Sequence, residues 1–578
     1  MRRNLAEVDR ETERLIHQRP IGLDPLTINT KRISLGAWLL SYLPVISWYP
    51  RRSYQVLVFV LTFACYASYH MTRKTFSAAK STLGPDCSTH QTGNCASDSG
   101  SQNDTGWRPF NETNCEALFG IVDNVWSFAY ALFLFGSGIV AERVDLRYFL
   151  TVGMIGSAIS TGMLGVAYFA KIYHLYYFLI WMAVSGIMQS TGWPGTVAVM
   201  GNWFGIKRRG FFMGVWNAHT SVGNILGTVI PAFWVEPGRP WGWAFVVPAL
   251  IMLVVAMAVF FFLVVDPTDI GQTPPKHHIS QSRRYRDDEK GDTGSLNHEN
   301  GAIVTINEDA NGFDPLGNKE HNTETKNTHK RKASVTSLAK DAGYNVLIGN
   351  DDGAIGIVKA LMIPGVVEFS LALFCSKLVA YTFLFWLPYY VRNRQIGGKC
   401  LGSKESDFLS TFFDVGGIVG GITAGVISDL LNARAISCTL MLYISVPALY
   451  ILHHFGNYDS AVFISLLILC GILVNGPYAC ITTAVSNDLG THKDLKGNQK
   501  AKATVSAIID GTGSVGAAIG PLLTGFISKH SWDNVFYLLM VSSFVSALLL
   551  TRLVIKEIIE LYRRYCHCYT CLRYCSTD

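Results

Sequence analysis

Twelve apolar runs, each long enough to cross a lipid bilayer, dominate this chain and restrict what it can fold into. A spanning helix needs roughly 20 mostly apolar residues, and the bilayer interior admits only segments whose backbone groups are hydrogen-bonded within the protein. We therefore expect twelve transmembrane helices. In chain order the runs lie at 54–72, 118–141, 148–170, 174–200, 210–234, 242–265, 358–391, 408–431, 436–454, 459–485, 503–528 and 532–555.

The composition agrees with a membrane protein. Of the 578 residues, 49% are hydrophobic and only 16% are charged, whereas about a quarter of the residues in a soluble protein are charged. The runs form two sets of six on either side of a polar stretch. The sequence thus predicts an all-α membrane protein with its twelve transmembrane helices in two six-helix bundles.

The runs divide the chain into five parts. The polar stretch cannot bury a core, so we expect a disordered linker there. A short apolar segment before the first run contains prolines and is expected to lie at the membrane surface. The expected parts are a cytoplasmic N-terminal arm at 1–53, a first bundle at 54–265 with a glycosylated lumenal loop at 77–115, a cytoplasmic linker at 266–355, a second bundle at 356–556 and a cytoplasmic Cys-rich tail at 557–578.

Charged residues predict the orientation of the chain. Basic residues gather in the N-terminal arm, in the loops after the second, fourth and tenth runs, and in the tail. Because positive charge favours the cytoplasmic side, both termini are expected to be cytoplasmic. Two glycosylation sequons, at Asn103 and Asn111, fall on the opposite side, which agrees with that orientation.

Cysteines occur on both expected sides of the membrane. Cys87, Cys95, Cys115 and Cys400 lie in opposite-side loops, where disulfides could form, and the sequence leaves their pairing open. Four more cysteines cluster in the tail, where palmitoylation and unmodified thiols are both consistent with the sequence. A zinc site is less favoured because the tail has little fold to orient ligands, so no metal site is expected.

Two loops share one spacing: a glycine, an acid four residues later and an arginine nine residues after the glycine. The glycine is expected to let two helices approach closely. The acid and the arginine are expected to form a charge-assisted bond that opens and closes as the halves rock, and so to gate the carrier. The gating residues are Gly138, Glu142 and Arg147 in the first half and Gly425, Asp429 and Arg434 in the second.

A second repeat relates the fifth and eleventh runs. Ser221-Val222-Gly223 in the fifth matches Ser514-Val515-Gly516 in the eleventh. Repeats at equivalent positions are typical of transporters whose substrate site lies between two similar bundles near the bilayer midplane.

The spaced loops resemble the signature between helices two and three of the major facilitator superfamily. Three further segments resemble the organophosphate–phosphate antiporters of that superfamily: 66–76, which contains Arg73-Lys74, then 192–195 and 216–219. The resemblance is strongest to the animal sugar-phosphate exchangers, solute carrier family 37. It implies exchange of a phosphorylated sugar, such as glucose 6-phosphate, for inorganic phosphate. It also favours the endoplasmic reticulum membrane, with the plasma membrane as the alternative.

Arg73 and Lys74 are the first candidates for binding phosphate. A buried cation in a membrane helix is costly and usually marks a substrate path. An arginine suits a phosphate because its planar fork binds two oxygens and keeps its charge. Lys74 is adjacent and points about 100° away on a helix. The alternative is that both residues cap the first helix at the membrane interface.

The second half is expected to supply a matching cation. Bacterial relatives have an arginine six residues before a tryptophan, and counting back from Trp386 gives Ala380 here. Lys377 lies one turn earlier, so we expect it to be the second phosphate ligand. The alternatives are pairing with Glu368 or reaching toward the membrane interface.

Four further residues are candidates for binding phosphate or sugar hydroxyls. Tyr66, Tyr69 and His70 share the helical face of Arg73. His219 lies one position before the place where bacterial glycerol-phosphate exchangers carry a histidine. Packing is the alternative for all four. The intramembrane acids Asp123, Glu368, Asp414 and Asp510 are not assigned to the site, because an acid suits an anion site only when it is paired.

These observations predict an antiporter that works by alternating access. Bound anion would cancel the repulsion between the cations and let the halves close, which gives obligatory exchange. No nucleotide-binding loop of the Walker type is present, and no catalytic constellation stands out. We therefore expect no enzyme activity, no cofactor and no nucleic-acid partner. The alternatives are a proton-coupled symporter of organic anions and a non-transporting membrane receptor or scaffold.

Overall fold

The computed structural model describes most of the membrane part of the chain. The N-terminal arm apart from residues 36, 39 and 50–53, the linker apart from residues 266–272, and most of the first opposite-side loop, including Asn103, lie outside it. The described residues are 36, 39, 50–84, 106–112, 114–141, 143–204, 209–236, 238–272, 360–489 and 499–575.

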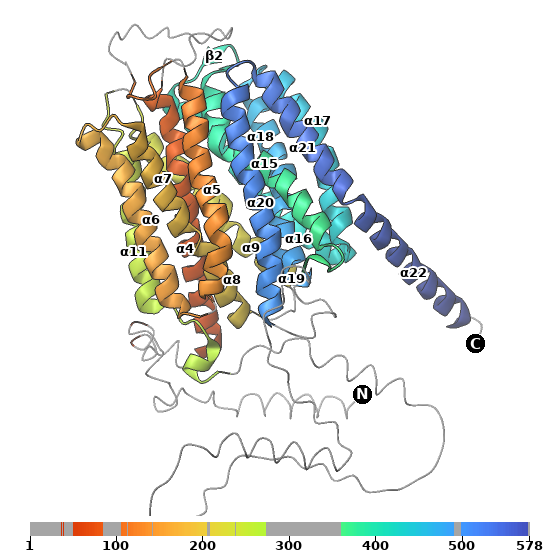
Figure 1. Cartoon of the computed structure of the whole chain (residues 1–578). Coiled ribbons are helices and arrows are strands. Elements are labelled where there is room, and N and C mark those ends of the chain that lie inside the picture. The colour runs from red at the N-terminus through yellow and green to blue at the C-terminus, as the bar shows by residue number, and fades with distance from the viewer. Residues whose placement is uncertain are drawn as a thin grey trace, which may run out of the picture. The chain divides into compact units, whose positions relative to one another are not determined.

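All six predicted runs of the first half are helical, and two of them are broken into two helices. The first half forms the red to yellow-green part of Figure 1. Its helices are α4 (Pro50–Leu83), α5 (Cys115–Ala141), α6 (Leu146–Phe169), α7 (Leu175–Gln189), α8 (Gly192–Trp203), α9 (Arg209–Asn217), α10 (His219–Ala232) and α11 (Trp243–Phe262), followed by the short 3₁₀ helix η3 (Pro267–Ile270).

The second half repeats this plan and forms the green to blue part of Figure 1. A short hairpin separates its first two helices. Its elements are α15 (Val366–Arg392), β1 (Gln395–Ile396), β2 (Lys399–Cys400), α16 (Ser403–Leu431), α17 (Arg434–Phe455), α18 (Ser460–Cys480), the π-helical η5 (Ile481–Val485), α19 (Ser486–Leu489), α20 (Gln499–Ile527), α21 (Trp532–Leu549) and α22 (Thr551–Cys575). We call the end of the molecule that carries β1 and β2 the hairpin end, and the end where α22 emerges the tail end.

The helix count agrees with the prediction of twelve. Within the described residues, ten single helices are long and apolar enough to span a membrane. The two remaining runs are the broken pairs α7–α8 and α9–α10. The first break lies just before Pro194, whose ring has no N–H and clashes with the carbonyl of the preceding turn.

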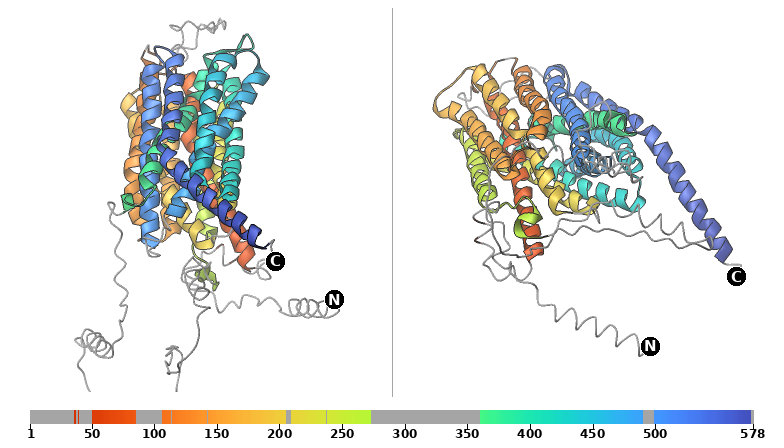
Figure 2. Two further views of the ribbon diagram at one scale, coloured as in Figure 1. Left: turned by 90° about the vertical axis from the view of Figure 1, so that its right-hand side faces the viewer. Right: turned by 60° about the horizontal axis from the view of Figure 1, so that its bottom comes forward.

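Two helices differ from the predicted boundaries. α4 continues to Leu83, beyond the predicted end at 72 and into the segment expected to be a loop. The reason is that the polar residues in its last turns find buried partners, as described below. The twelfth run divides at Leu550, and α22 continues past the bundle to Cys575 (Figures 1 and 2).

Glycines set equivalent helix contacts in the two halves. A Cβ at Gly223 of α10 would overlap the backbone oxygen of Ala67 in α4. A Cβ at Gly516 of α20 would overlap the backbone oxygen of Phe374 in α15 in the same way. The Ser-Val-Gly repeat therefore marks the same packing of the fifth helix on the first in each half. At Gly138, by contrast, a Cβ would meet nothing within 4 Å among the described residues, so these show no close helix approach at this glycine.

The two halves pack on each other along two seams, α5 against α20 and α9–α10 against α16. Cys115 at the start of α5 and Cys400 in β2 are both disulfide-bonded, as opposite-side cysteines could be. Asn111 is half-buried in the segment before α5. The side chains of the tail cysteines lie outside the described residues, so palmitoylation stays a prediction.

The Gly416→Ala substitution is expected to destabilise the second half. The added Cβ would overlap the backbone oxygen of Ile468, because α16 and α18 are in direct contact at this glycine. Overpacking of this kind costs about 1–3 kcal/mol, so thermal unfolding in detergent should shift to lower temperature.

Gly136→Ala is the matched control, since a Cβ at Gly136 meets nothing within 4 Å. Equal unfolding temperatures for the two variants would show that the α16–α18 contact is looser than described.

Candidate functional site

Arg73 lies in the interior of the first half with part of its hydrogen-bonding capacity unused. It is 4% exposed. Its Nη1 donates to the Tyr381 hydroxyl of α15 at 2.9 Å, and its Nε donates to Gln189 Oε1 of α7 at 3.3 Å. Its guanidinium lies 4.5 Å from the ring centre of Trp126 and 5.0 Å from that of Tyr130.

No carboxylate among the described residues pairs with Arg73, and its Nη2 has no hydrogen-bond partner there. A buried cation normally has a counter-charge, because removing it from water is costly. Arg73 therefore offers a fixed positive charge and a free donor to an anion.

A polar cavity lies between the halves next to Arg73. It is lined by residues of α4, α10, α15, α16 and α18, and Tyr381, which holds Arg73, is part of its wall. Its other polar lining residues are His70, Thr220, Asn224, Asp414, Asn475 and Tyr478.

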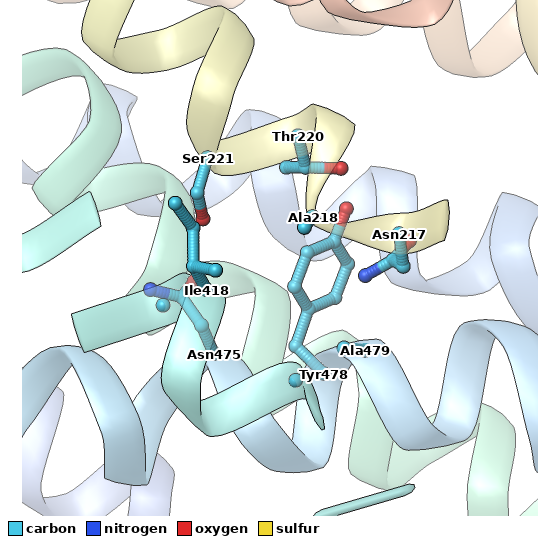
Figure 3. A pocket seen from close by; sticks show the side chains of 10 residues that line it. Asn217, Ala218, Thr220, Ser221, Ile418, Asn475, Tyr478 and Ala479 are labelled. Carbon is cyan, nitrogen blue, oxygen red and sulfur yellow. The ribbon is translucent and has the colours of Figure 1, made fainter. Parts of the chain in front are cut away.

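A second cavity lies next to the first on its tail side, and both are lined by Thr220, Asn475 and Tyr478. In Figure 3 the Tyr478 side chain reaches from α18 toward Thr220 and Asn217, which lie on the opposite half. Residues of both halves therefore line each of the two cavities.

One hydrogen-bonded chain crosses the cavity between the halves. His70 Nδ1 lies 3.1 Å from Asn224 Oδ1, and Asn224 Nδ2 donates to Asp414 Oδ1 at 2.9 Å. Because the amide oxygen only accepts, the His70 Nδ1 carries the proton in this arrangement. The chain thus ends on the carboxylate of Asp414.

Polar bonds between α4 and α15 close the hairpin end. Lys74 Nζ donates to the backbone oxygen of Leu384. Ser77 Oγ donates to the backbone oxygen of Phe385 at 2.9 Å, and Lys80 Nζ reaches the same oxygen at 2.9 Å. All of these residues lie nearer the hairpin end than Arg73 does on α4.

Lys80 also forms an ion pair that is completely buried. Its Nζ lies 2.5 Å from Asp123 Oδ2 of α5, and both side chains are 0% exposed. The ring centre of Trp386 lies 4.1 Å from the same nitrogen. These partners explain why α4 stays helical through residues whose polarity predicted a loop.

Two further contacts join the halves near the hairpin end. Glu116 accepts from the Tyr389 hydroxyl at 3.1 Å and from Ser528 Oγ at 3.3 Å. Lys404 pairs with Glu236 at 3.2 Å. The cavity therefore lies on the tail side of a closed polar layer.

Lys377, the cation expected in the second half, is paired. Its Nζ lies 2.8 Å from Asp510 Oδ1 and 3.3 Å from Ser514 Oγ, both of α20. The Tyr478 ring, which lines the cavity, is 5.7 Å from the same nitrogen. Of the alternatives for Lys377, Glu368 is excluded as the partner because it pairs with Arg552.

The aromatic candidates differ in where they lie. His70 lines the cavity. The Tyr66 ring packs against His219 at 4.6 Å and Trp193 at 5.4 Å. The Tyr69 hydroxyl lies 3.1 Å from Thr191 Oγ1.

His219 is fully buried beside the Trp216 ring, with Nδ1 3.3 Å from Thr220 Oγ1. Its Nε2 has no hydrogen-bond partner among the described residues. Tyr66, Tyr69 and His219 thus pack inside the first half behind the cavity wall.

The expected acid–arginine gating pair is described as a pair in the second half only. Asp429 and Arg434 pair at 3.2 Å across the turn between α16 and α17, where Arg434 also donates to Ser428 Oγ at 2.8 Å. Glu142 lies outside the described residues. Arg147, its expected partner, contacts the hydroxyl of Tyr148 at 3.5 Å.

Several site residues were not found from the sequence. Tyr381 and Asn224 give no signal in a single sequence beyond being polar in an apolar helix, and Gln189 is similar. Asp414 stood out as an intramembrane acid but was not assigned to the site. Lys80 was placed in a loop, so its pairing with Asp123 was missed.

Two six-helix halves with a polar cavity between them define a multi-pass membrane transporter. Residues 58–495 match the Major Facilitator Superfamily model, and the chain belongs to this superfamily. This confirms the predicted fold class.

Named relatives make the family assignment narrower. The chain is 45% identical over 509 residues to "Glucose-6-phosphate exchanger SLC37A2" of Bos taurus, covering 88% of this chain and 95% of the relative. It is 44% identical to the Homo sapiens protein of the same name, over 91% and 96% of the two chains. It is 45% identical to "Putative glycerol-3-phosphate transporter 1" of Arabidopsis thaliana, over 88% and 89%. The predicted membership of solute carrier family 37 is confirmed.

The Asp123→Asn substitution is expected to destabilise the first half strongly. It would leave the Lys80 ammonium buried without a counter-charge, which costs about 3–5 kcal/mol. The measurement is thermal unfolding of the purified protein in detergent.

The double variant Lys80→Met/Asp123→Leu removes both charges and should recover most of that loss. A double variant as unstable as Asp123→Asn would show that an unpaired charge is not the cause.

Proposed function

We propose that this protein exchanges a phosphorylated sugar of the glucose 6-phosphate kind for inorganic phosphate, by alternating access. The observation that carries the proposal is Arg73, a buried cation without a carboxylate partner in the described part of the chain. Relatives named as exchangers or transporters of sugar and glycerol phosphates support the choice of substrate.

Arg73 is proposed to bind the phosphate group. Its free Nη2 and its Nη1, which now bonds Tyr381, can both turn to phosphate oxygens. A guanidinium binds two such oxygens in its fork and stays charged at any pH the cell meets.

Lys377 is proposed to be the second cation, made available by competition. In this structure Asp510 neutralises it at 2.8 Å. A bound phosphate monoester, with between one and two negative charges near neutral pH, would compete with that carboxylate for the ammonium. Binding would thereby loosen the pair between α15 and α20.

Phosphate binding at Arg73 and the closing of the hairpin end are proposed to be linked through α4. Arg73 and Lys80 lie seven residues apart, about two helical turns, on the same rigid helix. A movement of α4 that follows phosphate binding therefore also acts on the bonds from Lys74, Ser77 and Lys80 to α15.

The hairpin end is proposed to face the lumen of the endoplasmic reticulum, with both termini cytoplasmic. The support is the basic charge of the tail-side segments and the position of the Asn111 sequon near the hairpin end. Imaging of a tagged chain would distinguish this compartment from the plasma membrane.

A second candidate function is proton-coupled transport of an organic anion. The observation that favours it is Asp414, a buried carboxylate in the cavity joined to His70 through Asn224.

The exchange proposal predicts that purified protein in liposomes takes up labelled phosphate only when phosphate or glucose 6-phosphate is inside. Uptake into empty vesicles should be at the level of protein-free liposomes. Uptake that instead follows an imposed pH gradient, whatever the internal solute, would favour the proton-coupled alternative.

The Arg73→Ala substitution is expected to lower exchange by about a hundredfold or more. It removes at least two charge-assisted hydrogen bonds to phosphate, worth together about 3 kcal/mol. Arg73→Lys keeps the charge without the fork and should be intermediate.

Arg552→Ala is the control for Arg73→Ala, because the Arg552 side chain is 82% exposed in its pair with Glu368 and exposed pairs contribute little. Full exchange by Arg73→Ala would rule out the assignment of the phosphate site.

A further inference from the structure

We propose that Asp414, with Asn224 and His70, forms the sugar end of the cavity and makes the carrier select polyhydroxylated monophosphates over phosphorylated carboxylates and bisphosphates. This inference rests on the proposed function and names the chemistry that the same site selects.

The cavity has two chemically different walls. At one wall Tyr381 holds Arg73, which supplies positive charge. Another wall carries the carboxylate of Asp414 on α16. A substrate with an anion at one end and neutral hydroxyls at the other fits this polarity.

Asp414 keeps hydrogen-bonding capacity for a ligand. Its Oδ1 accepts from Asn224, and no other hydrogen bond to this carboxylate is found among the described residues. No lysine or arginine forms an ion pair with it in that part of the chain, unlike Asp123 and Asp510. A carboxylate only accepts hydrogen bonds, so its free oxygen suits a donor such as a hydroxyl.

The chain behind Asp414 holds it in this accepting role. Asn224 donates to the carboxylate, and His70 donates to Asn224. The two bonds fix the Asn224 amide with its Nδ2 toward Asp414, so the carboxylate of Asp414 is held as an acceptor at the cavity wall.

Neighbouring groups on the same side are neutral and polar. Asn475 and Tyr478 line both cavities, and Thr220 lies opposite them. A few placed polar groups of this kind fix the orientation of a small ligand. The side chains of Thr220, Asn475 and Tyr478 can form hydrogen bonds with several hydroxyls. None of these three carries a positive charge that could neutralise a second anionic group of the substrate.

A second anionic group at this end would be repelled by Asp414. Like charges in a low-dielectric site interact strongly. A phosphorylated carboxylate or a bisphosphate therefore binds less well than a sugar monophosphate of similar size.

The test uses the full chain in liposomes loaded with phosphate. Labelled phosphate uptake is inhibited with glucose 6-phosphate, 3-phosphoglycerate or fructose 1,6-bisphosphate, and the half-inhibitory concentrations are compared. In Asp414→Asn, both half-inhibitory concentrations are measured against the phosphate–phosphate exchange that the variant retains. In this variant the half-inhibitory concentration of 3-phosphoglycerate, divided by that of glucose 6-phosphate, should fall about tenfold or more. A tenfold change corresponds to about 1.4 kcal/mol.

Asn475→Asp is the opposite variant, since it adds a carboxylate to the same wall. It should raise that ratio, so the proposal can be tested even where Asp414→Asn folds poorly. Asp407→Asn is the matched control. Asp407 is buried seven residues earlier on α16 and does not line the two cavities. The ratio of half-inhibitory concentrations in Asp407→Asn should therefore equal that of the unmodified protein.

The outcomes separate the two proposals. Absence of phosphate exchange in the unmodified protein would remove the proposed function. Exchange that persists with unchanged ratios in both Asp414→Asn and Asn475→Asp would overturn the sugar-end assignment alone. Loss of pH-gradient-driven uptake in Asp414→Asn with no change in the ratios would also overturn it, because Asp414 would then carry protons.

Discussion

The interior position of the Arg73 guanidinium is the constraint on which the rest of the site depends. Charge inside a membrane protein is costly, so each neighbour of this group has a physical role. Tyr381 and Gln189 accept two of its hydrogen bonds, and two aromatic faces lie against its plane. These neutral partners hold the cation without cancelling it, which keeps its charge available to an anion.

The two halves share a frame but differ in charge. Gly223 and Gly516 bring the fifth helix against the first in the same way in each half. On that common frame the first half places an uncompensated arginine, whereas the second places Lys377 beside Asp510. Under the proposed function, an anion in the cavity would be attracted by the unpaired charge of Arg73 in the first half. In the second half it would have to compete with Asp510 for the ammonium of Lys377.

The sequence predicted the fold well because a bilayer leaves few choices to a long apolar run. A motif shared with a known family made Arg73 a candidate for binding phosphate, which stays a prediction, and the structure places this residue in the interior. The sequence could not predict the partners of that residue, because Tyr381 lies 308 positions away and only the packing of the halves brings the two together. Packing within the first half explains the misplaced end of α4, since the charge of Lys80 is compensated by Asp123 on α5.

The Lys80–Asp123 pair has an electrical consequence. Both residues belong to the first half, so they move together when α4 separates from α15. A pair of zero net charge does no work against the membrane potential, whereas a single charge crossing 100 mV involves about 2.3 kcal/mol. The last turns of α4 can therefore break their contact with Phe385 without adding voltage dependence to the cycle, even though they carry a lysine in the membrane field.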